Sequence, residues 1–261
     1  MGGPYQRVTL GELSESVVKQ QTWLTYSWLK RRTHLQCVCG LKRVSASVKS
    51  VVWSSYSARL NKRIVIKKYF EDGPYEDEVQ GYLVFRGGPI AECLHQDSEQ
   101  RIIVLEYLDG RPPVGSLKDV TEIIFAYASM HRIAILNSAG IDVEWKPDDC
   151  CASMTHSRSD LSAVSVGDIK WEHIIFTRAG VRIVDLETWS LQRSVWFDIL
   201  SLINVMKLQG DQALNLEWIV RNYCTCRGLN SSDYDLEKIK VCLRAVQALS
   251  GKEGCQQGSR I

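Results

Sequence analysis

Two aspartates lie at the two ends of a short predicted hairpin in the second half of the chain. The apolar runs 174–176 and 181–184 are separated by residues 177–180, Thr-Arg-Ala-Gly, a pattern typical of two strands joined by a glycine-containing turn. Asp168 precedes the first run and Asp185 closes the second, so the closed hairpin brings both carboxylates to one rim. Such a pair suits a divalent metal ion and a proton acceptor. Two solvated acids on a surface hairpin are the simpler alternative.

The residues around both aspartates form two longer patterns. The first is Gly-Asp-Ile-Lys-Trp-Glu-His at 167–173, and the second is Ile-Val-Asp-Leu-Glu at 183–187. Together they resemble the catalytic loop and the metal-binding loop of the protein-kinase-like superfamily, especially its aminoglycoside phosphotransferase and choline kinase-like branch. The resemblance implies that Asp168 is the catalytic base and that Asp185 binds magnesium.

Three other positions of the first loop agree with the family only in part. His173 stands where the family has a metal-binding asparagine; its imidazole is expected to bind magnesium or orient Asp168, although oxygen ligands suit this ion better. Lys170 matches a phosphate-contacting lysine of many Ser/Thr protein kinases and is expected to offset charge on the transferred phosphoryl group. Val166 stands where many members have His or Tyr.

A lysine expected at the nucleotide lies in the strand predicted over 63–70. Because side chains alternate along a strand, Ile64 and Ile66 share one face, and Val65 and Lys67 share the other. The segment resembles the V-x-I-K strand of kinases, which implies that Lys67 contacts the α- and β-phosphates. A lysine at the end of an ordinary strand is the alternative.

The helix predicted from Pro74 carries acids in its first turns, where they suit the positive end of the helix dipole. In the family, a glutamate of this helix holds the strand lysine. Glu78 is expected in that role in preference to Glu76.

Two backbone segments that bind nucleotide in the family have partial counterparts. The turn at 45–50 has no glycine, so close approach of its backbone to phosphate is sterically harder. Ser47 and Lys49 are expected to substitute there. The apolar run that ends near Glu106 becomes polar after Leu108, as a hinge between lobes does, and the resemblance places the adenine against this segment.

The predicted elements give an α+β chain with a bilobal protein-kinase-like fold, in which a small antiparallel β N-lobe precedes a mainly helical C-lobe. The expected division is an amphipathic helix in 1–33, an N-lobe with hinge in 34–110, and a C-lobe with the catalytic and metal loops in 111–261. The segment 132–167 is long and irregular, and either shapes the acceptor site or is a surface excursion.

The C-lobe is predicted to begin with a helix opened by a capping box of Ser116 and Asp119 and ended at His131. His131 is expected to be a packed, hydrogen-bonded histidine. The resemblance implies that Asp198 is buried and accepts hydrogen bonds from the catalytic-loop backbone. Two later helices are predicted over 214–226 and 232–249.

The N-terminal helix, predicted over 13–32, has two tryptophans beside a basic end. Trp23 and Trp28 with Lys30 to Arg32 are compatible with a protein-partner or membrane-surface face. Packing of the helix across the N-terminal lobe is favoured, because a single amphipathic helix usually buries its apolar stripe against its own core.

Composition excludes several classes of protein. The 261 residues include 32 basic and 30 acidic side chains, so the net charge of +2 does not indicate a nucleic-acid partner. The nine cysteines form no paired C-x-x-C pattern, which favours reduced thiols over a zinc site. No apolar run approaches the roughly 20 residues of a spanning helix, so a cytoplasmic protein without a transmembrane segment is expected.

The sequence therefore predicts an enzyme that uses ATP and Mg²⁺ to transfer the γ-phosphoryl group to a hydroxyl of a small molecule or a Ser/Thr peptide. The alternative is a pseudokinase, a non-catalytic nucleotide-binding or scaffold subunit, which the glycine-free turn and His173 favour. A third class is an adaptor that uses the N-terminal helix.

Overall fold

The computed structural model describes residues 14–32, 35, 40–138, 165–167, 169–190, 195–208, 216–229 and 237. The chain divides into two compact units, the first of Met1–Val79 with Ala91–Tyr107 and the second of Gln80–Ile90 with Leu108–Ile261. Asp168, most of the predicted 132–167 segment and all but one residue of the helix predicted over 232–249 lie outside the described residues.

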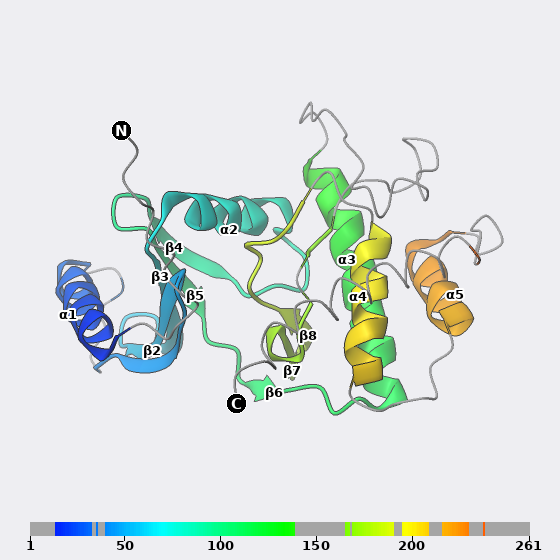
Figure 1. The fold of residues 1–261 in the computed structure, drawn as a ribbon, viewed down its shortest axis with the longest axis horizontal. Helices are drawn as coiled ribbons and strands as arrows, with labels where there is room; N and C mark the ends of the chain where they lie inside the picture. Colours follow the sequence, from blue (N-terminus) through cyan, green and yellow to red (C-terminus); the bar gives the residue numbers. More distant parts are fainter. Residues whose placement is uncertain are drawn as a thin grey trace, which may run out of the picture. The chain divides into compact units, whose positions relative to one another are not determined.

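The first unit contains an antiparallel five-stranded sheet in the order β1-β2-β3-β5-β4 (Figure 1). Its central strands are rich in β-branched residues, which favour a pleated, buried surface. Asn61 and Arg101 have positive φ values of 49° and 52° at the turns before β3 and β5. The strands are β1 (Lys42–Ala46), β2 (Ser50–Ser57), β3 (Lys62–Tyr69), β4 (Cys93–Asp97) and β5 (Ile102–Glu106).

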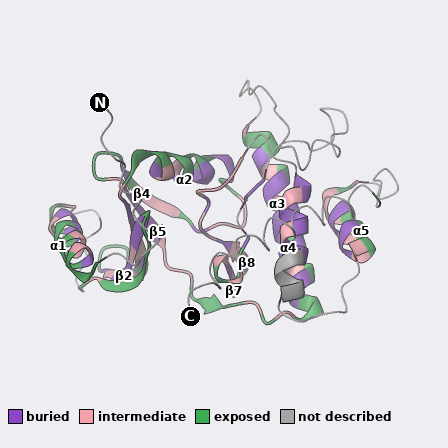
Figure 2. Cartoon of the chain, viewed as in Figure 1, coloured by how far each residue is buried: buried purple, intermediate pink, exposed green. Residues whose placement is uncertain are grey.

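Helix α1 (Glu15–Arg31) packs against this sheet, as predicted. Trp28 and Leu29 join the buried cluster formed by β2, β3 and β5. The indole Nε1 of Trp28 donates to Asp97 Oδ2 at 2.7 Å, and Arg32 forms an ion pair with the same carboxylate. Trp28 is only 2% exposed, which excludes it from the alternative of an exposed binding face, whereas Trp23 is 67% exposed. Figure 2 shows that α1 has both buried and exposed positions.

The second unit contains three described α-helices and a small sheet in the order β6-β7-β8. The predicted hairpin forms from β7 (Ile174–Thr177) and β8 (Gly180–Ile183), and a 3₁₀-helix over Trp171–His173 precedes it. Strand β6 (Gly110–Arg111) pairs with β7. The helices are α3 (Leu117–Asn137), α4 (Val195–Leu208) and α5 (Leu216–Arg227), and α2 (Asp72–Val84) contains the boundary between the units.

The predicted end of α3 at His131 is wrong, because the helix continues to Asn137. No Gly or Pro occurs between these two residues, so nothing in the local sequence stops the helix. None of the described helices is long and apolar enough to cross a membrane.

The segment that enters α3 is held by one buried carboxylate. Asp119 accepts two hydrogen bonds from the guanidinium of Arg111, at 2.9 and 2.7 Å, and one from the Val114 N–H at 2.7 Å. Ser116 caps the helix as predicted, accepting from the Asp119 N–H at 3.2 Å. The carboxylate half of the predicted capping box is replaced by the contacts to Arg111 and Val114.

Because of Asp119, we expect the stability of the protein to depend on pH. The hydrogen bonds from Arg111 hold the pKa of Asp119 below its usual range, with smaller contributions from Val114 and Ser116, although burial opposes them. A lowered carboxyl pKa stabilises the fold above the unfolded-state pKa of about 3.9 and loses that effect as pH falls through the folded-state value. Asp119→Asn should therefore be less stable than the unmodified protein near neutral pH, and the difference should vanish in acid. Denaturant unfolding across this pH range checks it; a pH-independent difference would contradict it.

Candidate active site

The ion pair expected in the first unit is formed. Lys67 projects from the face of β3 opposite Ile64 and Ile66, which are fully buried in the core. Its Nζ lies 2.7 Å from Oε2 of Glu78 on α2, and the two side chains are 10% and 1% exposed. Glu76 is exposed, which agrees with the choice of Glu78.

The surroundings of this pair fix the position of the ammonium group. A buried carboxylate is costly unless a cation compensates it, so Glu78 holds Lys67 close. The Lys67 Nζ also lies 4.8 Å from the centre of the Tyr69 ring, which adds a cation–π attraction. An ammonium held in this way presents a positive charge of fixed position, which suits phosphate oxygens.

The glycine-free turn between β1 and β2 is closed by one of its own serines. Ser47 Oγ accepts from the N–H groups of Lys49 and Ser50, at 3.2 and 3.1 Å, and the Ser47 N–H donates to the Ser50 carbonyl at 2.8 Å. Three N–H groups of this turn thus have partners within it. The expected phosphate contacts of Ser47 and Lys49 stay predictions.

The hinge residues also have partners in the sheet. The Glu106 side chain accepts from the Glu92 N–H at 2.9 Å, and the Tyr107 N–H donates to the Arg63 carbonyl at 3.2 Å. The guanidinium of Arg63 lies 3.6 Å from the centre of the Tyr107 ring. The expected adenine contacts at Glu106 and Leu108 stay predictions.

In the second unit, Asp185 follows β8 with a left-handed backbone, φ 66°. Non-glycine residues in this region are uncommon and are often found at functional sites. The Asp185 Oδ2 lies 3.2 Å from Nε2 of His173, and the neighbouring Val184 N–H donates to the His173 carbonyl at 3.0 Å. The hairpin therefore brings His173 and Asp185 together.

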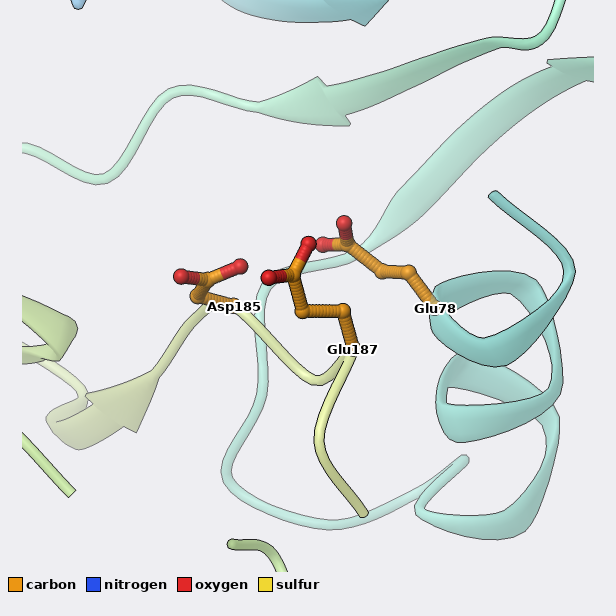
Figure 3. Close-up of side chains that lie close together, drawn as sticks. All are labelled: Glu78, Asp185 and Glu187. Carbon is orange, nitrogen blue, oxygen red and sulfur yellow. The ribbon is translucent and has the colours of Figure 1, made fainter. Parts of the chain in front are cut away.

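A second acidic side chain lies near Asp185. Glu187 offers a carboxylate oxygen within 4.8 Å of one from Asp185, and Figure 3 shows both on the segment after β8. Carboxylate oxygens are the ligands that Mg²⁺ prefers, so this pair fits the ion. The imidazole fits less well, because its Nε2 faces the Asp185 carboxylate at 3.2 Å and oxygen ligands suit Mg²⁺ better than a ring nitrogen.

The loop before the hairpin is anchored by a buried aspartate, as the resemblance implies. Asp198 on α4 is 0% exposed and accepts from the N–H groups of Val166 and Gly167, at 2.6 and 3.0 Å. It also accepts from Ser165 Oγ at 2.7 Å, and Nε2 of His131 lies 2.7 Å from its Oδ2. His131 is fully buried, so its expected structural role is confirmed.

Gly167 is required at its position on two grounds. Its φ of +99° disfavours side chains, and a Cβ there would lie 2.7 Å from the Thr188 carbonyl carbon.

The Ser165 and Ser190 backbones pair through reciprocal N–H to carbonyl bonds of 2.9 Å. Asp168, the expected base, follows Gly167 directly in sequence and lies outside the described residues; Lys170 is exposed.

Comparison with known proteins gives the fold. No family model matches the sequence, and no curated protein does. A choline/ethanolamine kinase family protein from Mesorhizobium loti has a similar structure, with a TM-score of 0.57 at 11% identity over 93% of this chain and 89% of that one. A thermostable mutant of aminoglycoside phosphotransferase APH(4)-Ia, in a ternary complex with AMP-PNP and hygromycin B, gives 0.53 at 12% identity over 87% and 92%.

The chain has the bilobal protein-kinase-like fold. The resemblance to the aminoglycoside phosphotransferase and choline kinase-like branch is confirmed at the level of this fold. At 11–12% identity, structural similarity shows the kinase-like fold alone. The activity has to be inferred from the side chains of this chain.

Two residues of interest were not in the expected site. Glu187 lies two residues after Asp185 in the segment 183–187, so its carboxylate is visible in the sequence as a second metal-ligand candidate. Tyr223, whose hydroxyl lies 2.7 Å from Nδ1 of His131, is 92 positions away from that histidine, and no local pattern marks it.

Proposed function

We propose that the protein is an ATP- and magnesium-dependent phosphotransferase that moves the γ-phosphoryl group to a hydroxyl. The observation that carries the proposal is the buried ion pair of Lys67 and Glu78, which occurs on a kinase-like fold. A structural role alone would be served as well by two apolar side chains, since buried ion pairs seldom add net stability.

The proposed roles follow the chemistry of each side chain. Lys67 binds the α- and β-phosphate oxygens, and Glu78 keeps its ammonium in place. Ser47 and Lys49 lie over the phosphates, and the backbone of Glu106 and Leu108 binds the adenine edge.

The remaining roles are proposed for residues of the second unit. The carboxylates of Asp185 and Glu187 hold magnesium, which supplies neutralisation of phosphate charge when bound. Asp168 accepts the proton of the incoming hydroxyl, and Lys170 offsets the negative charge on the transferred group.

The acceptor is proposed to be a small aminated molecule or sugar, with a Ser/Thr peptide as the second possibility. One structural neighbour was crystallised with the aminoglycoside hygromycin B and AMP-PNP, which supports a small hydroxyl acceptor. The test is transfer of labelled γ-phosphate to a panel of aminoglycosides, amino alcohols, sugars and serine peptides. Asp168→Ala should abolish any transfer found. If this variant transferred phosphate as fast as the unmodified protein, Asp168 would not be the base.

His173 is proposed to orient Asp185 and not to bind magnesium itself, since its Nε2 faces the Asp185 carboxylate at 3.2 Å. His173→Asn, which restores an oxygen ligand, should lower the magnesium concentration for half-maximal activity by roughly tenfold. His173→Ala, which has neither group, should raise it. A higher magnesium requirement in the asparagine variant would show that the imidazole is the better ligand.

A pseudokinase is the second candidate. The observation that favours it is the Ser47 turn, in which three N–H groups already have partners within the turn. Such a protein, a non-catalytic nucleotide-binding or scaffold subunit, would transfer no phosphate under any acceptor condition.

A protein partner at the outer face of α1 is also proposed, on the exposure of Trp23, Leu24 and Tyr26. Deleting the helix is an unsuitable test, because Trp28 and Leu29 belong to the core of the first unit. Trp23→Glu leaves that core in place. It should abolish capture of any partner while phosphate transfer persists; unchanged capture would contradict the proposal.

A further inference from the structure

A chain of buried hydrogen bonds runs from α5 to the backbone that precedes Asp168. The Tyr223 hydroxyl lies 2.7 Å from Nδ1 of His131, and Nε2 of His131 lies 2.7 Å from Oδ2 of Asp198. All three side chains are 0% exposed. Asp198 continues the chain to the N–H groups of Val166 and Gly167.

The donors and acceptors along this chain can be assigned from Asp198 outward. The carboxylate of Asp198 accepts from two backbone N–H groups and from Ser165 Oγ, so His131 must donate to it through Nε2–H. In the neutral imidazole, the other nitrogen then carries a lone pair. A neutral His131 would thus accept at Nδ1 from the Tyr223 hydroxyl.

We propose that Tyr223 is a positioning residue whose hydroxyl keeps the His131 proton on Nε2. In this tautomer, Nε2–H of His131 donates to Asp198 and so keeps the Asp198 carboxylate in contact with residues 165–167. Because residues 165–167 lead directly into Asp168, the hydroxyl contributes to the placement of the proposed base. This last consequence rests on the proposed function, whereas the tautomer and the anchoring of the loop do not.

Packing alone does not account for a tyrosine at this position. The Tyr223 ring meets Trp196 edge to face at 5.3 Å and His131 at 5.7 Å, and a phenylalanine would make the same ring contacts. The hydroxyl adds a buried polar group, which is costly unless it is hydrogen-bonded. Its contact with Nδ1 therefore fits a specific role in fixing the imidazole.

The first test reads the tautomer directly by NMR of the full-length protein labelled with ¹⁵N-histidine. The chain has five histidines, and His131→Gln identifies the signals of His131 by their loss. The unmodified protein should show His131 protonated at Nε2 alone. Tyr223→Phe should shift His131 toward the other tautomer or to exchange between the two. A doubly protonated or Nδ1-protonated His131 in the unmodified protein, or unchanged signals in Tyr223→Phe, would overturn the proposal.

The second test measures the effect on phosphate transfer. Tyr223→Phe should lower kcat by about tenfold with little change in the KM for ATP, as expected for loss of an orienting partner. On a His131→Gln background, Tyr223→Phe should have no further effect, because the hydroxyl acts through the imidazole. Additive losses of kcat in the double variant would show that the Tyr223 hydroxyl does not act through His131.

Ile219→Val is the matched control, since Ile219 is fully buried one helical turn earlier on α5. It should lower Tm to a similar extent as Tyr223→Phe and leave kcat unchanged. If Ile219→Val lost as much kcat as Tyr223→Phe, the effect of Tyr223 on kcat would be explained by packing alone. If no acceptor is ever phosphorylated, the proposed function fails, and the NMR result still decides whether Tyr223 fixes the tautomer.

Discussion

Lys67→Met should lower the free energy of unfolding by about 3–5 kcal/mol, because it leaves the carboxylate of Glu78 buried without its cation. The Glu78 side chain is only 1% exposed and the two charged atoms are 2.7 Å apart, so water cannot replace the ammonium. Phosphate transfer should fall by about 10²–10³-fold through loss of the charge at the phosphates. Denaturant unfolding and transfer assays measure the two effects separately.

The double variant Lys67→Met with Glu78→Leu separates stability from activity. Replacing both members of a buried ion pair by apolar residues is often neutral or stabilising, so stability should return. Activity should remain absent, and its recovery would show that Lys67 does not contact phosphate. Lys68→Met is the matched control, since Lys68 is equally buried on the next position of β3 and donates to the Gln100 carbonyl. It should retain activity.

Asp198→Asn should cost more than about 3 kcal/mol of stability, since it removes the acceptor from a buried, fully hydrogen-bonded network. The two carboxylate oxygens face four donors, whereas an asparagine amide offers one oxygen and a new pair of N–H groups. Hydrogen exchange of the Val166 and Gly167 amides should accelerate in parallel.

Ser165→Ala serves as the control for the Asp198 variant. It removes one donor and leaves both carboxylate oxygens in place, so it should cost only about 1 kcal/mol. An Asp198→Asn protein as stable as the unmodified one would show that the carboxylate charge does not hold this loop.

Much of the fold follows from local pattern. The hairpin of β7 and β8 is predictable because two apolar runs flank a turn in which Gly180 adopts a φ of 101°. Helix α1 begins after Ser14, which accepts from the Val17 N–H, and this type of cap is readable in sequence. The pairing of Lys67 with Glu78 followed from strand alternation together with the family pattern.

The features that local pattern does not predict depend on side-chain contacts and on residues distant in the chain. The early end expected for α3 at His131 came from the family pattern, whereas the local sequence has no Gly or Pro before Asn137, where the helix ends. Tyr223 lies in a segment whose pattern is that of any packed helix. The two turn N–H groups that donate to Ser47 follow from side-chain geometry, which composition does not determine.

The most direct test of the proposed phosphotransferase is the thermal stability of the full chain with ATP or AMP-PNP, with and without magnesium, repeated on Asp185→Ala. At a ligand concentration 100-fold above its Kd, bound nucleotide should add about 2.7 kcal/mol of stability. We predict that this gain requires magnesium, is lost in Asp185→Ala, and persists in Glu217→Ala, which alters an exposed acid on α5. No stabilisation of the unmodified protein by any nucleotide, or a stabilisation that Asp185→Ala retains in full, would contradict the account.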